Sequence, residues 1–335
     1  MKTNKIADRI PEVSLEPIER MARGHEISQI LFTAIEYDIF TLLTEPKTAV
    51  QISKEIRTDL HLTEKFLNAL VALQLLLKIN DRYANTKISE TFLVKESPFY
   101  QGNLLKLMAN GYNTWSKLGN MLRGIGVQES EEKFEYIDKV FIFGHAEGAI
   151  SGSLQKTVRT VAALSEFKNA KRLLDLGGGH GLYAIAFGQL NPSLDIFVFD
   201  LPHVTEITRN FIEQYGMKDR IKVIAGDFTK DDIRNGYDII FASDVPIFGI
   251  LKKIHSALNE GGVLIYRRWI LNDDGTAPLV SVLFDLMLSI RRSDHHVCTL
   301  GEYIDWLGKA NLSITRVIDI FTPSDPTKII VAKKV

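Results

Sequence analysis

The sequence predicts an α/β protein in two parts, a mostly helical N-terminal part and a C-terminal parallel sheet covered by helices on both faces. After residue 171, short apolar runs alternate with segments of helical periodicity, a pattern typical of parallel strands joined by crossover helices. Before residue 171, apolar residues recur mainly at helical spacing, and one short stretch has the character of a hairpin. The length of 335 residues, at roughly 150 residues per domain, agrees with about two domains.

Composition excludes several classes of protein. Hydrophobic residues make up 45% of the chain and charged residues 24%, which is typical of a folded globular protein. A formal net charge of −1 provides no overall attraction for nucleic acid or for an anionic membrane. Cys298 is the single cysteine, and no segment resembles a signal peptide or approaches about 18 consecutive apolar residues. We therefore expect a cytoplasmic protein that binds neither nucleic acid nor membranes.

The N-terminal part is predicted to be a winged-helix module. Residues 15–43 have the apolar spacing of one or two amphipathic helices, residues 48–56 begin with a threonine suited to cap a helix, and residues 62–77 present an apolar face. Residues 79–93 are predicted to form a short hairpin. Residues 62–77 would be the helix that reads DNA, but they contain one lysine among many leucines. A role in packing or dimerisation is therefore favoured over DNA binding.

The C-terminal part is predicted to be an open sheet, reached through residues 101–166, which are again helical in pattern. The expected strands are residues 172–176, 194–200, 221–225, 237–241 and 262–266, and the expected helices are residues 182–190, 204–215 and 248–258. Two further strands, residues 313–321 and 328–333, are joined by residues 322–327 alone, a link too short for a crossover helix. That last pair is therefore predicted to be antiparallel.

The most informative segment is a glycine turn between the first strand and the first helix of this sheet. Open α/β sheets bind ligands at the carboxyl ends of their strands, and glycines allow the backbone to approach a ligand closely. A dinucleotide fingerprint would require a third glycine where Leu182 stands, and no Gly-Lys-Ser/Thr follows to form a phosphate-binding loop. The spacing of Gly177, Gly179 and Gly181 instead resembles the loop of class I S-adenosylmethionine (SAM)-dependent methyltransferases.

Carboxylates end three successive strands around this turn. Asp175 lies on the first strand, and Asp200 ends the second, where a carboxylate can accept hydrogen bonds from both hydroxyls of a ribose. Asp227 follows the third strand and precedes Phe228, a pair suited to the amine and the ring face of an adenine. A single aspartate at such a place is often only a cap or turn residue, but three beside a glycine turn favour a ligand site.

The resemblance extends over the whole chain, to small-molecule O-methyltransferases of the caffeate and acetylserotonin type. The segments that carry it are residues 173–181, Phe199-Asp-Leu-Pro-His-Val204, Gly226-Asp-Phe228 and residues 254–262. It implies a winged-helix dimerisation domain in residues 1–105, a helical connector that contributes to the acceptor pocket in residues 106–168, and a Rossmann-like SAM domain in residues 169–335. It also implies a homodimer, and a reaction that converts SAM to S-adenosylhomocysteine (SAH) without a metal. The residues expected to bind the cofactor are Asp175, Gly177, Gly178, Gly179, Asp200, Leu201, Gly226, Asp227, Phe228 and Ser243.

The chain departs from the family where the general base is expected. In the family a His-Asp pair follows the fourth strand, and a glutamate on the fifth strand orients the histidine; here Pro246 and Ile247 stand at the first place and Arg268 at the second. General-base catalysis contributes a factor of about 10² to 10⁴. Three explanations stay open: an acceptor that is already anionic or otherwise nucleophilic, another residue that acts as the base, or chemistry other than methyl transfer.

The candidates to replace the base are His145 in the connector, Arg268, and His296 next to His295. Arg268 could hold a phenolate in its ionised form, or clamp an anionic group of the acceptor. The arginine pairs Arg267–Arg268 and Arg291–Arg292 are otherwise expected on the surface. Three further histidines, His180, His203 and His255, are expected to be cofactor-side, surface or packing residues.

These observations predict a SAM-dependent methyltransferase that acts on a small, aromatic or polyketide-like acceptor, with O-methylation as the first choice. One alternative is a family member that binds SAM but performs a decarboxylation, hydroxylation or cyclisation, or methylates carbon, nitrogen or sulfur, or only binds its ligand. Another is a winged-helix regulator that senses SAM, against which the leucine-rich segment 62–77 argues.

Overall fold

The computed structural model describes residue 6 and residues 10–125, 139–291, 296–320 and 325–335. The chain divides into two compact units, Met1–Ala109 and Asn110–Val335. Each unit has its own hydrophobic core. In the described part of the chain, no helix combines the length and the apolar character needed to cross a membrane.

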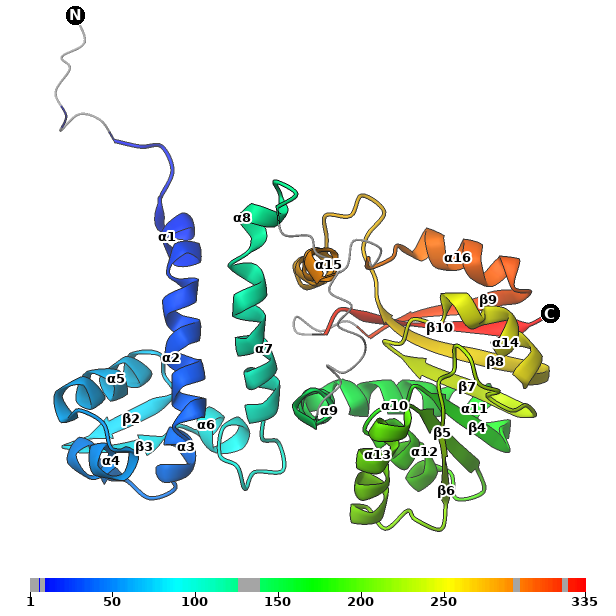
Figure 1. Cartoon of the computed structure of the whole chain (residues 1–335), viewed down its shortest axis with the longest axis horizontal. Coiled ribbons are helices and arrows are strands. Elements are labelled where there is room, and N and C mark those ends of the chain that lie inside the picture. The colour runs from blue at the N-terminus through cyan, green and yellow to red at the C-terminus, as the bar shows by residue number, and fades with distance from the viewer. Residues whose placement is uncertain (1–5, 7–9, 126–138, 292–295, 321–324) are drawn as a thin grey trace, which may run out of the picture. The chain divides into compact units, whose positions relative to one another are not determined.

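The first unit is a helical module with a small antiparallel sheet (Figure 1). Its elements are α1 (Glu16–Ala22), α2 (Gly24–Glu36), α3 (Ile39–Leu42), β1 (Lys47–Thr48), α4 (Ala49–Ile56), α5 (Leu60–Ala72), β2 (Leu76–Ile79), β3 (Arg82–Asn85) and α6 (Lys87–Phe92). Helix α4 begins with a capping box, in which Thr48 and Gln51 bond each other's backbone N–H. The core lies where α2, α3, α4 and α5 meet the sheet.

The predicted helix 62–77 and hairpin 79–93 were wrong in their boundaries. Helix α5 ends at Ala72, because Gln74 adopts a left-handed conformation (φ 59°) and the N–H of Leu75 bonds the carbonyl of Leu70 at 2.9 Å. Leu76 and Leu77 therefore belong to strand β2, which pairs with β3. The second half of the expected hairpin is helix α6.

The second unit is a sheet of seven strands in the order β6-β5-β4-β7-β8-β10-β9. The strands are β4 (Arg172–Leu176), β5 (Asp195–Asp200), β6 (Ile221–Ala225), β7 (Tyr237–Ser243), β8 (Leu258–Trp269), β9 (Leu312–Asp319) and β10 (Thr327–Lys334). Strands β4 to β8 are parallel, and β10 runs antiparallel to both of its neighbours. The predicted parallel sheet and the antiparallel last pair are thus confirmed, and β8 is longer than expected at both ends.

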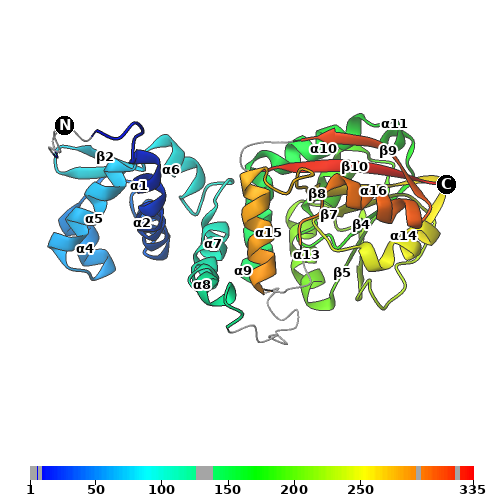
Figure 2. The ribbon, with the colours of Figure 1, turned by 90° about the horizontal axis from the view of Figure 1, so that it is seen from above.

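Helices cover both faces of this sheet (Figures 1 and 2). The helices of the unit are α8 (Leu118–Met121), α9 (Lys139–Gly148), the π-helical turn η3 (Ala149–Ser153), α10 (Leu154–Ala163), α11 (Ser165–Asn169), α12 (Leu182–Leu190), α13 (Pro202–Gln214), the 3-10 turn η4 (Phe248–Ile250), α14 (Leu251–Ala257), α15 (Leu279–Arg291) and α16 (Leu300–Lys309), while α7 (Gly102–Trp115) spans the boundary between the units. Helices α10 and α12 pack on one face and α14 and α16 on the other. Side chains alternate between these faces, so that Ile265 points to the first and Tyr266 to the second.

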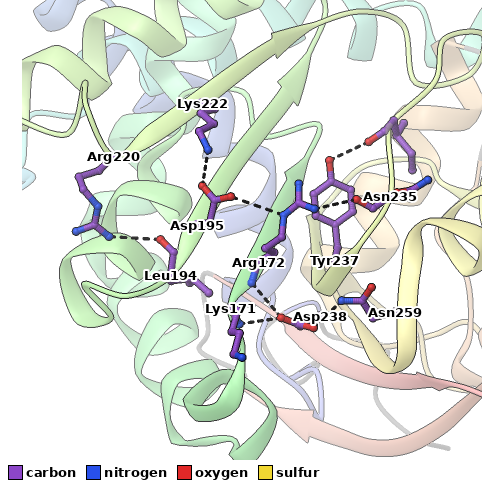
Figure 3. Close-up of polar contacts among 11 residues, drawn as sticks. Lys171, Arg172, Leu194, Asp195, Arg220, Lys222, Asn235, Tyr237, Asp238 and Asn259 are labelled. Carbon is purple, nitrogen blue, oxygen red and sulfur yellow. Dashed lines mark hydrogen bonds and ion pairs between the residues drawn. The ribbon is translucent and has the colours of Figure 1, made fainter.

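A polar network fixes the amino ends of the strands (Figure 3). One carboxylate oxygen of Asp238 accepts hydrogen bonds from the backbone N–H groups of Lys171, at 2.8 Å, and Arg172, at 3.0 Å, while the other accepts from Asn259. The guanidinium of Arg172 reaches Asp195 on the neighbouring strand. Since this edge of the sheet is filled by its own side chains, the carboxyl edge is the one available for a ligand.

Candidate functional site

The glycine turn at the end of β4 leaves no room for a side chain at Gly177, Gly178 or Gly181, whereas Gly179 has space around it but a left-handed backbone. Gly177, Gly179 and Gly181 have φ values of 67°, 54° and 73°. A Cβ atom on Gly177 would lie 2.7 Å from Cγ1 of Val245, and one on Gly178 would lie 2.6 Å from Cγ1 of Val198. The turn therefore presents bare backbone at the carboxyl edge of the sheet, next to the start of α12.

Asp200 is bonded to this turn. Its carboxylate accepts the N–H of Gly179 on Oδ2 and the N–H of Leu201 on Oδ1, both at 2.7 Å. Burial raises the pKa of Asp200, and the two backbone N–H groups partly offset that effect. Each carboxylate oxygen can accept a second hydrogen bond, so the side chain remains able to bind the hydroxyls of a ribose.

Asp175 is a fully buried carboxylate with a raised pKa. It is 1% exposed, and its Oδ2 atom has no hydrogen-bond partner among the described residues. Burial, and then the charge of Asp200, raise the pKa of Asp175 from 3.8 to about 7. A buried acceptor without a donor, directly below the glycine turn, suits a ligand that brings a positive charge or a hydrogen-bond donor.

The segment Gly226-Asp-Phe228 is held in a tight turn. The Asp227 carboxylate accepts hydrogen bonds from Thr229 and lies 3.0 Å from Nζ of Lys230, and these contacts lower its pKa to about 2. The carbonyl of Phe228 accepts a hydrogen bond from Nζ of Lys253 at 2.8 Å. In this structure the carboxylate faces its own turn, and its contact with an adenine stays a prediction.

A buried arginine that the sequence did not single out for this role organises the carboxyl ends of β7 and β8. Arg267 donates to Ser243 at 3.2 Å, to Asp325 at 2.6 Å and to Asp244. Its Nε atom also donates to Thr157 of α10 at 3.2 Å. Arg267 is 5% exposed, so the expected surface position was wrong. Its carboxylate partners, Asp244 and Asp325, are 23 and 58 residues away in the chain, so this contact cannot be predicted from the local sequence pattern.

Arg268 is also buried, on the opposite face of the sheet. Its Nε atom donates to the hydroxyl of Tyr303 at 3.0 Å, and its guanidinium lies 5.7 Å from the centre of the Tyr266 ring. The expected surface position was therefore wrong for Arg268 as well. The side chain of Arg291, and all of Arg292, lie outside the described residues.

The histidines are separated by the fold. His145 is exposed on α9 and bonds the Phe141 carbonyl of its own helix at 2.8 Å. His180 is buried in the glycine turn, and burial, with His145 and Arg267 nearby, lowers its pKa to about 3, so it is neutral. His203 is exposed at the start of α13, and His255 lies on α14, 3.5 Å from the carbonyl of Val335.

His296 lies in a small group with Cys298 and Glu302, whose ligand-type atoms are within 4.8 Å of one another. The Glu302 carboxylate already accepts hydrogen bonds from His296 and from Thr299, which it caps. Burial raises the pKa of the Cys298 thiol to about 11, so the thiol is protonated. These contacts favour a structural role for the group. His295 lies outside the described residues.

Comparison with known proteins gives the family. Residues 120–310 match the O-methyltransferase domain, and residues 19–95 match the O-methyltransferase dimerisation domain. The chain belongs to the O-methyltransferase family. Its relatives include the uncharacterized protein MJ0086 of Methanocaldococcus jannaschii, at 31% identity over 98% of this chain and 99% of that protein. Acetylserotonin O-methyltransferase of Bos taurus is 28% identical over 89% and 92%, and the N,N-dimethyltransferase OxyT of Streptomyces rimosus is 25% identical over 88% and 89%.

Solved structures agree with this assignment of the fold. Human N-acetylserotonin methyltransferase in complex with SAM superposes with a TM-score of 0.82, at 24% identity over 97% of this chain and 99% of that one. PigF with SAH gives a TM-score of 0.84, at 22% identity over 96% and 100%. The expected α/β sheet with an N-terminal helical domain is therefore confirmed, and the family models confirm the expected O-methyltransferase and dimerisation domains.

The residues of this methyltransferase fit SAM. The glycine turn offers bare backbone, Asp200 offers two acceptor oxygens, and Asp175 has an acceptor oxygen without a partner in the described structure. SAM carries a positively charged sulfonium and an amino group, both of which complement these carboxylates. When bound, it supplies an electrophilic methyl group.

Pro246 and Ile247, which stand where the family's His-Asp pair is expected, offer no protonatable side chain to this methyltransferase. Ile247 is buried in the core under α14 and α16, and Pro246 is exposed. The preceding residue, Val245, packs over Gly177, and its carbonyl accepts a hydrogen bond from the hydroxyl of Tyr266 at 2.6 Å.

Proposed function

We propose that this methyltransferase transfers a methyl group from SAM to a small aromatic or polyketide-like acceptor, chiefly onto oxygen, without the family's histidine base. The observation that carries the proposal is the glycine turn, which is bonded to Asp200 and lies next to the Asp175 oxygen that has no partner in the described part of the chain. Relatives that act on acetylserotonin and on 3-hydroxy-5-methyl-1-naphthoate support a small aromatic acceptor. The relative OxyT, an N,N-dimethyltransferase, supports nitrogen as the alternative acceptor atom.

The proposed division of labour places dimerisation in residues 1–105, part of the acceptor pocket in residues 106–168, and SAM binding in residues 169–335. Exposed apolar residues on α1 and α2, among them Ile18, Met21 and Ile27, support a homodimer formed through the first unit. The single cysteine, which is buried and unpaired, supports a cytoplasmic location. Light scattering tests the dimer, and a monomeric mass at micromolar concentration would contradict it.

Calorimetry with SAM and SAH, followed by transfer of labelled methyl groups into extracts and into pure phenols, tests the reaction. We expect binding of both ligands and label in a small-molecule fraction. The absence of a histidine at Pro246 favours one second candidate, a SAM-binding protein with other chemistry. Tight binding of SAM with no labelled product in either assay would favour that candidate.

A further inference from the structure

The polar residues around Arg267 form a hydrogen-bonded cluster at the carboxyl edge of the sheet. We call Arg267, Asp244, Asp325, Ser243 and Thr157 the Arg267 cluster. Its members come from β7 and the residue after it, from β8, from α10, and from the segment before β10. Arg267 and Asp325 are nearly closed to solvent, with side chains 6% and 12% exposed, whereas the side chain of Asp244 is 37% exposed. The cluster therefore has one open member, Asp244.

Asp244 is held in a conformation that aspartate seldom adopts. Its φ is 57°, and its backbone N–H donates to the carbonyl of Arg267 at 3.0 Å. Left-handed backbone at residues other than glycine has an energetic cost and concentrates at functional sites. Within the described part of the chain, both hydrogen bonds to the carboxylate, from Arg267 and Ser243, go to Oδ2. The Oδ1 atom is therefore available to another molecule.

The neighbours of Asp244 place it beside the cofactor turn. The next residue, Val245, lies against Gly177, and its carbonyl is fixed by Tyr266. On the other side of the cluster, Thr157 follows the π-helical turn η3, in which Gly152 has a φ of 137°. Such turns are often found at functional sites. The strained residue, the irregular helix and the glycine turn therefore converge on one place.

The two carboxylates of the cluster differ in their access to solvent. One guanidinium, that of Arg267, faces two carboxylates, and the Thr157 and Ser243 hydroxyls are neutral. Of these two carboxylates, that of Asp244 is the open one, so it places a negative charge at the solvent-facing side of the cluster. A negative charge there attracts a hydrogen-bond donor and repels an anion. Because two carboxylates already occupy Arg267, it is not free to clamp an acidic acceptor.

We propose that Asp244 is a catalytic residue whose Oδ1 atom accepts the reacting O–H or N–H of an acceptor that carries no anionic group beside that atom. Arg267 and Asp325 are positioning residues. The inference rests on the proposed function and deepens it by naming the acceptor class, an uncharged hydroxyl or amine with no anionic group beside the reacting atom.

The acceptor, SAM, Asp244 and water account for all atoms and electrons of the methyl transfer. The lone pair of the acceptor atom forms a bond to the methyl carbon, the bond from that carbon to sulfur breaks, and its electron pair stays on sulfur. The O–H or N–H becomes strongly acidic as the new bond forms, so a carboxylate is a sufficient base late in the step. The proton passes to Oδ1 of Asp244 and from there to water.

The test compares Asp244→Asn with the wild type, with Asp325→Asn and with the control Asp219→Asn, an exposed aspartate between α13 and β6. Asparagine keeps the shape of the side chain and tolerates the left-handed backbone, so Asp244→Asn should fold. The probes are 5-hydroxyindole, 5-aminoindole and 5-hydroxyindole-6-carboxylate, which share a ring and differ in the reacting atom or in an anionic neighbour.

We expect the wild type to methylate the first two probes at least about tenfold more efficiently than the carboxylate probe. Asp244→Asn should lower kcat on those two probes by about 100-fold or more, with the Kd for SAM unchanged within about threefold. Asp325→Asn should lower kcat by about tenfold, mainly at unchanged KM, because it acts through Arg267. As a readout without turnover, calorimetry on the SAH-loaded protein should show 5-aminoindole bound about tenfold more weakly by Asp244→Asn.

The experiment distinguishes a failure of the role of Asp244 from a failure of the acceptor class and from a failure of the proposed function. Wild-type transfer combined with an Asp244→Asn variant within threefold of it in kcat and in probe affinity would overturn the role of Asp244 and leave the proposed function intact. Preference for the carboxylate probe, or label only in an anionic extract component, would overturn the acceptor class. No transfer by the wild type to any probe or extract would overturn the proposed function, and this inference with it.

Discussion

Replacing Asp175 by asparagine should make the second unit more stable at high pH and not at low pH. The carboxyl group has a pKa of about 7 in the folded chain, raised from 3.8 by burial and by Asp200. Below about pH 3, the group is largely protonated in both states and carries little penalty. As the pH rises from about 4 to 7, the unfolded chain loses this proton while the folded chain keeps it, so the free energy of unfolding falls. Above about pH 7 the penalty is constant.

The size of the effect follows from the same values. Each pKa unit corresponds to about 1.36 kcal/mol, so a rise from 3.8 to about 7 corresponds to a penalty of about 4 kcal/mol at alkaline pH. Asp175→Asn removes this pH-dependent part. Any cost of leaving a buried amide N–H without a partner is the same at every pH, so it cancels when the difference between variant and wild type is compared at two pH values.

Urea unfolding at pH 5 and pH 8 measures this difference. All three tryptophans, Trp115, Trp269 and Trp306, belong to the second unit, so their fluorescence reports its unfolding. From pH 5 to pH 8, the free energy of unfolding of Asp175→Asn should rise by about 2–3 kcal/mol relative to that of the wild type. Asp238→Asn is the control, and its difference from the wild type should be the same at pH 5 and pH 8, because a carboxyl group with a lowered pKa is ionised in both states at both pH values. Burial alone would raise the pKa of Asp238, but hydrogen bonds from Asn259, Lys171 and Arg172 outweigh it and lower the pKa. An unchanged difference between variant and wild type at pH 5 and pH 8 would refute the reasoning about Asp175.

Three further outcomes are expected. Gly178→Ala should lower the free energy of unfolding by about 1–3 kcal/mol and weaken SAH binding in calorimetry, because the new Cβ atom would lie 2.6 Å from Val198. The control is Gly249→Ala, whose Cβ atom would meet no atom within 4 Å, and it should change neither stability nor SAH binding. Asp200→Asn should reduce the gain in Tm that saturating SAM gives the wild type, and an equal gain would argue against a ribose contact. Arg268→Ala should lower the free energy of unfolding in urea by about 2–4 kcal/mol while SAM still binds, because the change opens a cavity and leaves the Tyr303 hydroxyl without its donor. A variant with wild-type stability and turnover would exclude both a structural and a catalytic role for Arg268.

The sheet could be predicted from sequence because its signals are local. Strands β4 to β7 are apolar runs, and the glycine turn follows the first of them directly. The end of α5 could not be predicted, since the left-handed cap that ends it is Gln74 rather than a glycine, and the leucines on either side fit a helix as well as a strand.

The cofactor turn could be predicted and the Arg267 cluster could not, for the same physical reason. Gly177, Gly179 and Asp200 act through a short motif and its neighbouring strand end. Arg267 is buried only because Asp244 and Asp325 reach it from distant parts of the chain, and two adjacent arginines after an apolar strand otherwise indicate a surface. The left-handed conformation of Asp244 has no signal in the sequence.

The crowding of the glycine turn has a consequence for how this enzyme can change. No single substitution at Gly177, Gly178 or Gly181 can be absorbed without displacing a neighbour, because even a methyl group would come within 2.7, 2.6 and 2.9 Å of another side chain. Asp244, one residue from the contact with that turn, has a side chain that is 37% exposed, with both described hydrogen bonds to its carboxylate on Oδ2. Substitutions that change the acceptor are therefore expected at positions outside the turn and other than Asp244, while the methyl donor remains the same.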